Sequence, residues 1–96
     1  MAYKLTEAAE EDVIHLLAEG GRQFGLRQAH AYYAELLECF VFLAENPRAA
    51  RERTDLSPVV RIHPYGSHVI IYQITVDDDV LILAVRHARE NWQDDL

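Results

Sequence analysis

The first half of the chain carries apolar residues at the spacing of an α-helix. Apolar or small residues recur every three or four positions over residues 9–20 and again over residues 29–43. Thr6 precedes the first stripe as a candidate N-cap, and Gly25 separates the two stripes as a candidate left-handed stop. The second stripe ends at Pro47, which cannot continue a helix. The pattern therefore predicts two helices that form an antiparallel hairpin.

The second half changes to the period of β-strands. A polar, arginine-rich loop is expected over residues 48–58, followed by three strands at residues 59–62, 67–75 and 79–86. The last of these is apolar on both faces, so we expect it to be central or covered on both sides. A brief strand is also expected at residues 3–5. The prediction is an α+β fold of order β-α-α-β-β-β, in which a three-stranded antiparallel meander forms a small sheet, the hairpin packs on one face, and a short C-terminal tail follows.

Length and composition limit the class of protein. The chain has 96 residues, half of them apolar, which suits a single domain over residues 1–96. Its longest apolar run covers residues 80–85, far short of the roughly 18 residues of a membrane span. The acidic opening does not resemble a secretory signal, so we expect a cytoplasmic protein without membrane contact. Cys39 is the only cysteine, and the pattern predicts no disulfide, no metal and no cofactor.

The formal charge of −7 argues against a nonspecific nucleic-acid binder. The charge is unevenly distributed, because residues 1–47 are acidic and residues 48–89 hold six arginines. Guanidinium groups pair well with carboxylates and phosphates. The sequence therefore allows a local surface for an anionic partner on an acidic protein, although any one arginine is more simply explained as a scattered, solvated charge.

Short motifs spread from Tyr3 to Arg89 occur together, in this order, in one known family. They are residues 3–13 (YKLTEAAEEDV), Gly25, Gln28-Ala29, Tyr33, residues 43–47 (LAENP), Arg51-Glu52-Arg53 before Asp55-Leu56, residues 65–72 (YGSHVIIY) and residues 82–89 (ILAVRHAR). By these motifs the chain resembles toxins of the RelE/ParE superfamily, and within it the ParE branch. The chain departs from that family at two places. Ala49-Ala50 stands where a glycine usually follows the proline, and Arg86 lies two positions later than the family's arginine, on the same face of the strand.

The resemblance to ParE implies a toxin of a type II toxin-antitoxin system that inhibits DNA gyrase by protein–protein binding, with no catalysis of its own. It also implies that the region after the last strand matters for toxicity. The residues expected to contact the target are Arg86, His87, Arg89 and Trp92. Trp92 has two readings, because an exposed aromatic ring would anchor an interface, whereas the same ring could instead fold back onto the sheet.

The resemblance to RelE implies a second activity, ribosome-dependent cleavage of mRNA. That reaction needs groups that take and give a proton and a cation that stabilises the phosphorane. The candidates are Arg61, His63, Arg86 and His87. A third possibility is a non-toxic member that only binds its antitoxin.

The expected partner is a ParD-like antitoxin, which would supply the only contact with DNA. A small sheet covered by one hairpin leaves a groove in which a disordered segment can fold. The residues expected to bind the antitoxin are Arg51, Arg53, Arg61, Arg86, Tyr32 and Tyr33. Among the other residues, we expect His68 to be half-buried and structural and His15 and His30 to lie on helix surfaces.

Overall fold

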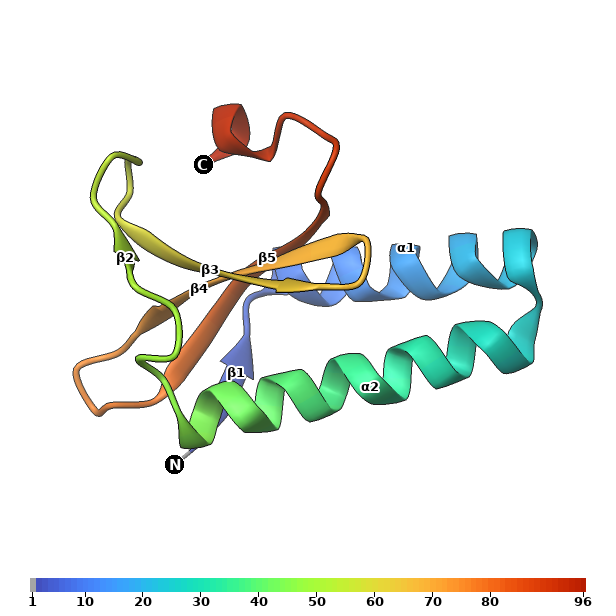
Figure 1. The fold of residues 1–96 in the computed structure, drawn as a ribbon, viewed down its shortest axis with the longest axis horizontal. Coiled ribbons are helices and arrows are strands. Elements are labelled where there is room, and N and C mark those ends of the chain that lie inside the picture. Colours follow the sequence, from blue (N-terminus) through green and yellow to red (C-terminus); the bar gives the residue numbers. More distant parts are fainter. Residues whose placement is uncertain (1) are drawn as a thin grey trace.

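A long helical hairpin and a strongly twisted sheet make up the protein in a computed structural model, which describes residues 2–96 (Figure 1). In chain order the elements are β1 (Tyr3–Leu5), α1 (Glu7–Phe24), α2 (Leu26–Glu45), β2 (Glu52–Arg53), β3 (Val60–Tyr65), β4 (His68–Ile74), β5 (Val80–His87) and a 3₁₀ turn, η1 (Trp92–Asp95). No helix among residues 2–96 is long and apolar enough to cross a membrane.

The sheet has five strands and is mixed, which corrects the predicted three-stranded meander. The strand order is β1-β5-β4-β3-β2. The predicted meander forms its centre, but β1 adds to β5 in parallel, with Tyr3 opposite Val80. Residues 48–58, predicted as loop, contain β2, which pairs with β3 through Glu52 and Arg53. The strand predicted at residues 3–5 is confirmed, but its pairing with the distant β5 was not predicted. β2 has only two residues, too few to show a period of its own.

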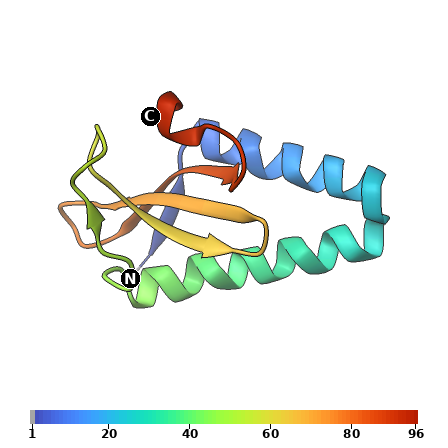
Figure 2. The same cartoon turned by 45° about the horizontal axis from the view of Figure 1, so that its top comes forward.

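The helical hairpin agrees with the sequence pattern. Thr6 caps α1, because its side-chain oxygen accepts a hydrogen bond from the Ala9 backbone N–H at 3.1 Å. Gly25 alone separates the helices; its φ of 88° is positive as predicted, but its ψ of 160° is extended rather than left-handed helical. Figure 2 shows that the connected ends of α1 and α2 project beyond the sheet. This overhang leaves room between the hairpin and the end of the sheet.

Alternate residues of the central strand β4 pack into two separate apolar clusters. Ile70 and Tyr72 face the helices and pack with Leu36 and Phe40 of α2. We call this side of the sheet the inner face. Residues on the opposite, outer face join a second cluster, made of Val60, Val69, Ile71 and Trp92. Because α1 and α2 lie on the inner face only, the outer face is covered by the C-terminal tail and by Leu56 from the segment between β2 and β3.

Candidate functional site

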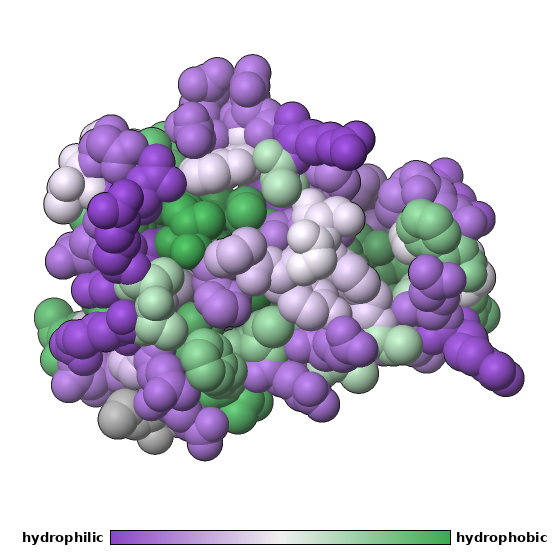
Figure 3. Space-filling model, viewed as in Figure 1, coloured by the Kyte–Doolittle hydropathy of each residue, from purple (hydrophilic) through white to green (hydrophobic). Residues whose placement is uncertain are grey.

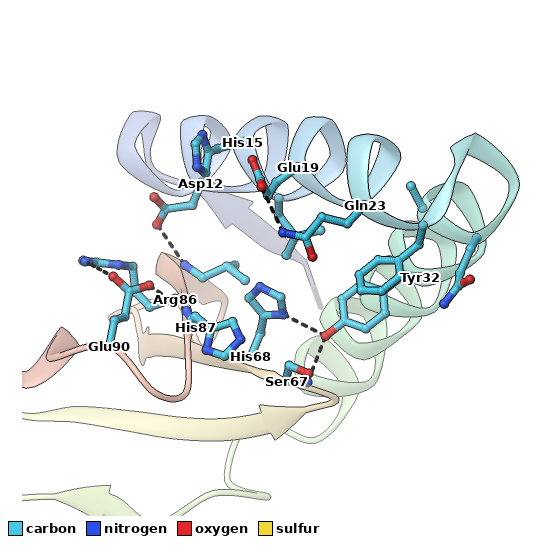
Figure 4. Close-up of a pocket in the computed structure, with 16 residues that line it drawn as sticks. Asp12, His15, Glu19, Gln23, Tyr32, Ser67, His68, Arg86, His87 and Glu90 are labelled. Atoms are coloured by element: carbon cyan, nitrogen blue, oxygen red, sulfur yellow. Dashed lines mark hydrogen bonds and ion pairs between the residues drawn. The ribbon is translucent and has the colours of Figure 1, made fainter.

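A cleft of about 700 Å³ lies between the overhanging hairpin and the end of the sheet (Figure 4). One wall comes from α1 and α2, and the other from the start of β4, the end of β5 and the first tail residues. Most of the residues that line the cleft are polar or titratable, through side-chain or backbone atoms. These are Asp12, His15, Glu19, Gln23, Gln28, Tyr32, Ser67, His68, Arg86, His87 and Glu90.

Tyr32 links α2 to the β3–β4 turn at one end of this cleft. Its hydroxyl lies 2.8 Å from His68 Nδ1 and 3.2 Å from the Tyr65 carbonyl oxygen, and it accepts the Ser67 backbone N–H at 3.1 Å. Burial raises the pKa of the Tyr32 hydroxyl, which therefore stays protonated. Gly66 permits this approach, because a Cβ atom at position 66 would lie only 2.5 Å from the Tyr32 oxygen. Tyr32 thus holds the β3–β4 turn beneath the hairpin.

Two histidines meet on the floor of the cleft. The rings of His68 and His87 lie edge to face with centroids 5.3 Å apart, on directly paired positions of β4 and β5. Burial lowers the pKa of His68, and the neighbouring His87 adds to that effect. Glu90 opposes it more weakly. The half-buried His68 agrees with its predicted structural role, while His87 is exposed at the mouth.

The acidic side chains of the cleft already have partners. Asp12 accepts the Val85 backbone N–H at 3.0 Å, which ties α1 to β5. Glu19 pairs with Arg22 and Gln23 one turn along α1, and the hydrogen bond from Gln23 lowers its pKa most. These carboxylates therefore organise the wall of the cleft. Among residues 2–96, no group of three histidine, cysteine, aspartate or glutamate side chains is placed to hold a metal ion.

The four residues considered for RNA cleavage do not come together. Arg61 is paired with Tyr72 of β4, and His87 is paired with His68, four residues away along the same strand. At roughly 3.3 Å per residue this places Arg61 and His87 about 13 Å apart along the strands.

Face as well as distance separates these four residues. Arg86 is paired with Val69 and lies on the outer face, while His63 is paired with Ile70 on the inner face. His63 stacks near Phe42 of α2, with ring centroids 5.8 Å apart, and burial lowers its pKa. No single reacting phosphate could touch all four side chains.

The predicted antitoxin-binding residues occupy separate regions. Arg51, Arg53 and Arg61 form a loose cluster around β2, in which Arg53 is paired with Val60 of the outer face and Arg61 is paired with Tyr72 of the inner face. Arg53 forms two hydrogen bonds with Asp55, at 2.8 and 2.9 Å, and Arg61 donates to the Ala50 carbonyl at 2.6 Å and pairs with Glu52 at 3.7 Å. Arg51 is exposed and forms no ion pair with any of residues 2–96.

The two tyrosines of that set lie on α2, away from these arginines. Tyr33 packs against the inner cluster, and Tyr32 lines the cleft. The structure therefore does not assemble the six predicted residues into one patch.

The predicted target-binding residues lie at the end of β5 and in the tail. Arg86 pairs with Glu90 at 2.7 Å and with Asp95 at 2.8 Å, and these two carboxylates raise its pKa. Trp92 as a residue is only 8% exposed and packs onto the outer face of the sheet. Of the two interpretations of this residue, the packed one therefore holds in this structure. His87 and Arg89 are exposed.

Sequence reasoning missed the wall that α1 contributes to the cleft. Asp12, Leu16, Glu19 and Gln23 follow one another at intervals of four, three and four, which places them on one face of the helix. That spacing is visible in the sequence. What the sequence lacks is any sign that this face overhangs the end of the sheet.

Comparison with known proteins identifies relatives of the chain over nearly its whole length. Residues 3–92 match the family model described as ParE toxin of type II toxin-antitoxin system, parDE. Toxin ParE1 of Mycobacterium tuberculosis is 29% identical over 87 residues, which cover 91% of this chain and 89% of the relative. Toxin ParE1 of Caulobacter vibrioides is 29% identical over 89 residues, which cover 93% and 91%.

A solved structure shares the fold. The structure titled "Chromosomal ParDE TA system from P. aeruginosa" aligns with a TM-score of 0.74 at 19% identity, over 91% of this chain and 95% of that one. The two proteins therefore share one overall fold over most of their length.

Proposed function

The chain belongs to the ParE toxin family of type II toxin-antitoxin systems, and we propose that it is the toxin of such a pair, inhibits DNA gyrase and is neutralised by a ParD-like antitoxin. In this proposal the toxin acts in the cytoplasm by binding a protein, without catalysis, metal or cofactor. The observation that carries it is the family match over residues 3–92, nearly the whole chain.

The dispersal of the basic side chains supports a binding role over the nuclease alternative. Arg61 and His63 lie on the inner face of β3, and Arg86 lies on the outer face of β5, locked to two carboxylates. General acid–base cleavage needs its groups within hydrogen-bonding reach of one phosphate. A binding protein has no such requirement.

The antitoxin partner is proposed from the pairing that gives the family its description, parDE. Its acidic side chains would meet Arg51, the exposed member of the cluster around β2, and Arg53 and Arg61 if these exchange their present partners. Tyr32 and Tyr33 would contact it on the hairpin. Gyrase would be contacted through the end of β5 and the tail, at Arg86, His87, Arg89 and Trp92.

Purified toxin incubated with gyrase, ATP and supercoiled plasmid tests the target. We expect linear DNA after protein removal, because a poison traps the cleaved complex. Arg89→Ala should reduce the yield, since Arg89 is exposed and belongs to the proposed contact. Arg27→Ala is the matched control, because Arg27 is an exposed arginine at the start of α2, where the two helices are connected, and does not belong to the proposed contact.

Absence of linear DNA, with growth arrest intact on induction, would remove gyrase as the target. Primer-extension mapping of transcripts from the same cells then tests mRNA cleavage, with His63→Ala and His87→Ala as the informative variants. Normal growth without antitoxin would instead indicate a member that binds its antitoxin and inhibits nothing.

A further inference from the structure

The C-terminal tail, residues 88–96, folds back over the outer face of the sheet (Figure 1). Trp92 and Leu96 pack there with Val60, Val69 and Ile71. Both helices cover the other face, so this short segment and Leu56 are what shield the outer cluster from water. In Figure 3 hydrophobic atoms are visible in a hollow between the hydrophilic tail at the top and the β2 region at the left. The cover is therefore thin and incomplete.

Arg86 fastens this tail to the sheet. Its guanidinium bonds Glu90 Oε2 at 2.7 Å and Asp95 Oδ2 at 2.8 Å, thereby bridging both ends of the segment that carries Trp92. Glu90 Oε1 also accepts the His87 backbone N–H at 2.7 Å. The Arg86 side chain is 24% exposed, but its two carboxylate partners are 40% and 59% exposed. These contacts close the tail, yet water and salt can reach them.

The position of Arg86 gives it this role. Side chains alternate along β5, so residue 86 points to the outer face, where the tail lies, whereas residues 85 and 87 point to the inner face. The arginine that departs from the family's usual place is thus the residue that reaches the acidic tail. While the tail is in this position, the Arg86 charge is paired within the chain, and Arg86 can contact a partner only after these ion pairs open.

We infer that residues 88–96 are a strap, that Arg86 with Glu90 and Asp95 is its clasp, and that the closed strap withholds Trp92 from the toxin's target. The inference rests on the proposed function for its second half only. In the closed state Trp92 is buried against Val69 and Ile71 and cannot anchor an interface. Opening the clasp releases the Trp92 ring, so that this ring and the already exposed Arg89 can contact the same protein surface. Arg86 is a positioning residue in this scheme.

Intrinsic fluorescence tests the clasp directly, because Trp92 is the only tryptophan. The variants are Asp95→Asn and Arg86→Gln, and Asp94→Asn is the matched control, since Asp94 is exposed and pairs with no arginine among residues 2–96. We expect the first two to move the emission to longer wavelength. The ratio of open to closed strap should rise roughly twofold to fivefold, the factor that an exposed charge pair is worth, and acrylamide quenching should increase with it. Asp94→Asn should match the wild type.

A far-ultraviolet circular-dichroism melt distinguishes strap opening from unfolding of the whole protein. If Arg86→Gln does not fold, Asp95→Asn still tests the clasp, because it alters an exposed side chain. High salt should move the wild-type emission toward that of Asp95→Asn and change Asp95→Asn little. Wild-type emission in Asp95→Asn, or an equal shift in Asp94→Asn, would overturn the clasp.

The gyrase assay tests the second half. Asp95→Asn should reach half-maximal linear DNA at a roughly twofold to fivefold lower toxin concentration, again the factor of one exposed pair. A higher concentration requirement would overturn the inference, because the closed tail would then be the active form. If wild type and Asp95→Asn both leave gyrase unaffected while the fluorescence shifts, the proposed function fails and the clasp stands.

Discussion

At the scale of single residues, the cleft depends on one close approach. The Tyr32 ring sits directly over Gly66, and its hydroxyl connects the Ser67 backbone to His68. Gly66 itself has a φ of 54°, in the region that favours glycine. The same position therefore requires glycine for two independent reasons.

Gly66→Ala should destabilise the protein through backbone strain at the positive φ and through a clash with the Tyr32 ring. We expect on the order of 1–3 kcal/mol from backbone strain and a further cost of about 1–3 kcal/mol from overpacking against Tyr32. In a Tyr32→Ala background only the strain should remain, because the ring that the methyl group meets is gone. Urea unfolding of the four proteins measures the difference. Equal costs of Gly66→Ala in both backgrounds would contradict the clash.

Residue type alone did not reveal which charged groups are free. The six arginines after residue 47 look alike in the sequence, yet Arg61 is engaged with Ala50 and Glu52, Arg86 with Glu90 and Asp95, and Arg51 is exposed. Arg61 finds its partners in and just before β2, and Arg86 finds its partners in the tail, so which arginines are paired depends on how these segments fold. The predicted half-burial of His68 succeeded because strand alternation fixes the face on which a residue lies.

At the scale of elements, predictability followed the length of the pattern. The two helices and the three central strands repeat their apolar positions often enough to be located from sequence. The strand predicted at residues 3–5 is β1, but its parallel pairing with the distant β5 was not predicted. β2 has two residues inside the predicted loop, and it is defined by its pairing with β3, the next strand along the chain. The predicted three-stranded sheet was wrong because pairing of such short segments depends on the assembled fold.

The start of α1 depends on one contact that the local sequence predicts, the helix cap, and on one that it does not, a hydrogen bond to β5. Thr6 caps the helix through Ala9 N–H, and its hydroxyl also donates to the Leu83 carbonyl of β5 at 3.0 Å. Thr6→Ala should lower the free energy of unfolding by about 1–2 kcal/mol, since it removes a helix cap and leaves the Leu83 carbonyl without this donor. Thr6→Ser keeps both bonds and should cost less, as measured by urea unfolding. Equal losses in the two variants would assign the effect to the lost methyl group.

At the scale of the whole molecule, the formal charge of −7 does not show how many of the basic side chains are free to bind a partner. Of nine lysines and arginines, five arginines are ion-paired within residues 2–96. The remaining four lie on β1, at the hairpin tip, before β2 and in the tail; they are Lys4, Arg27, Arg51 and Arg89. They form no stripe that could follow a phosphate backbone.

The isolated chain should therefore leave nucleic acid unbound. In fluorescence anisotropy we expect no salt-dependent binding of a single-stranded RNA or a DNA duplex, because counterion release requires several cations that meet neighbouring phosphates. In the presence of gyrase, the toxin should associate with DNA only through the enzyme. Substituting both Arg51 and Arg89 should not change the anisotropy of labelled nucleic acid mixed with the isolated toxin. RNA binding that weakens steeply with salt would contradict this expectation. It would also favour mRNA cleavage over gyrase inhibition, because the toxin would then bind its substrate without help.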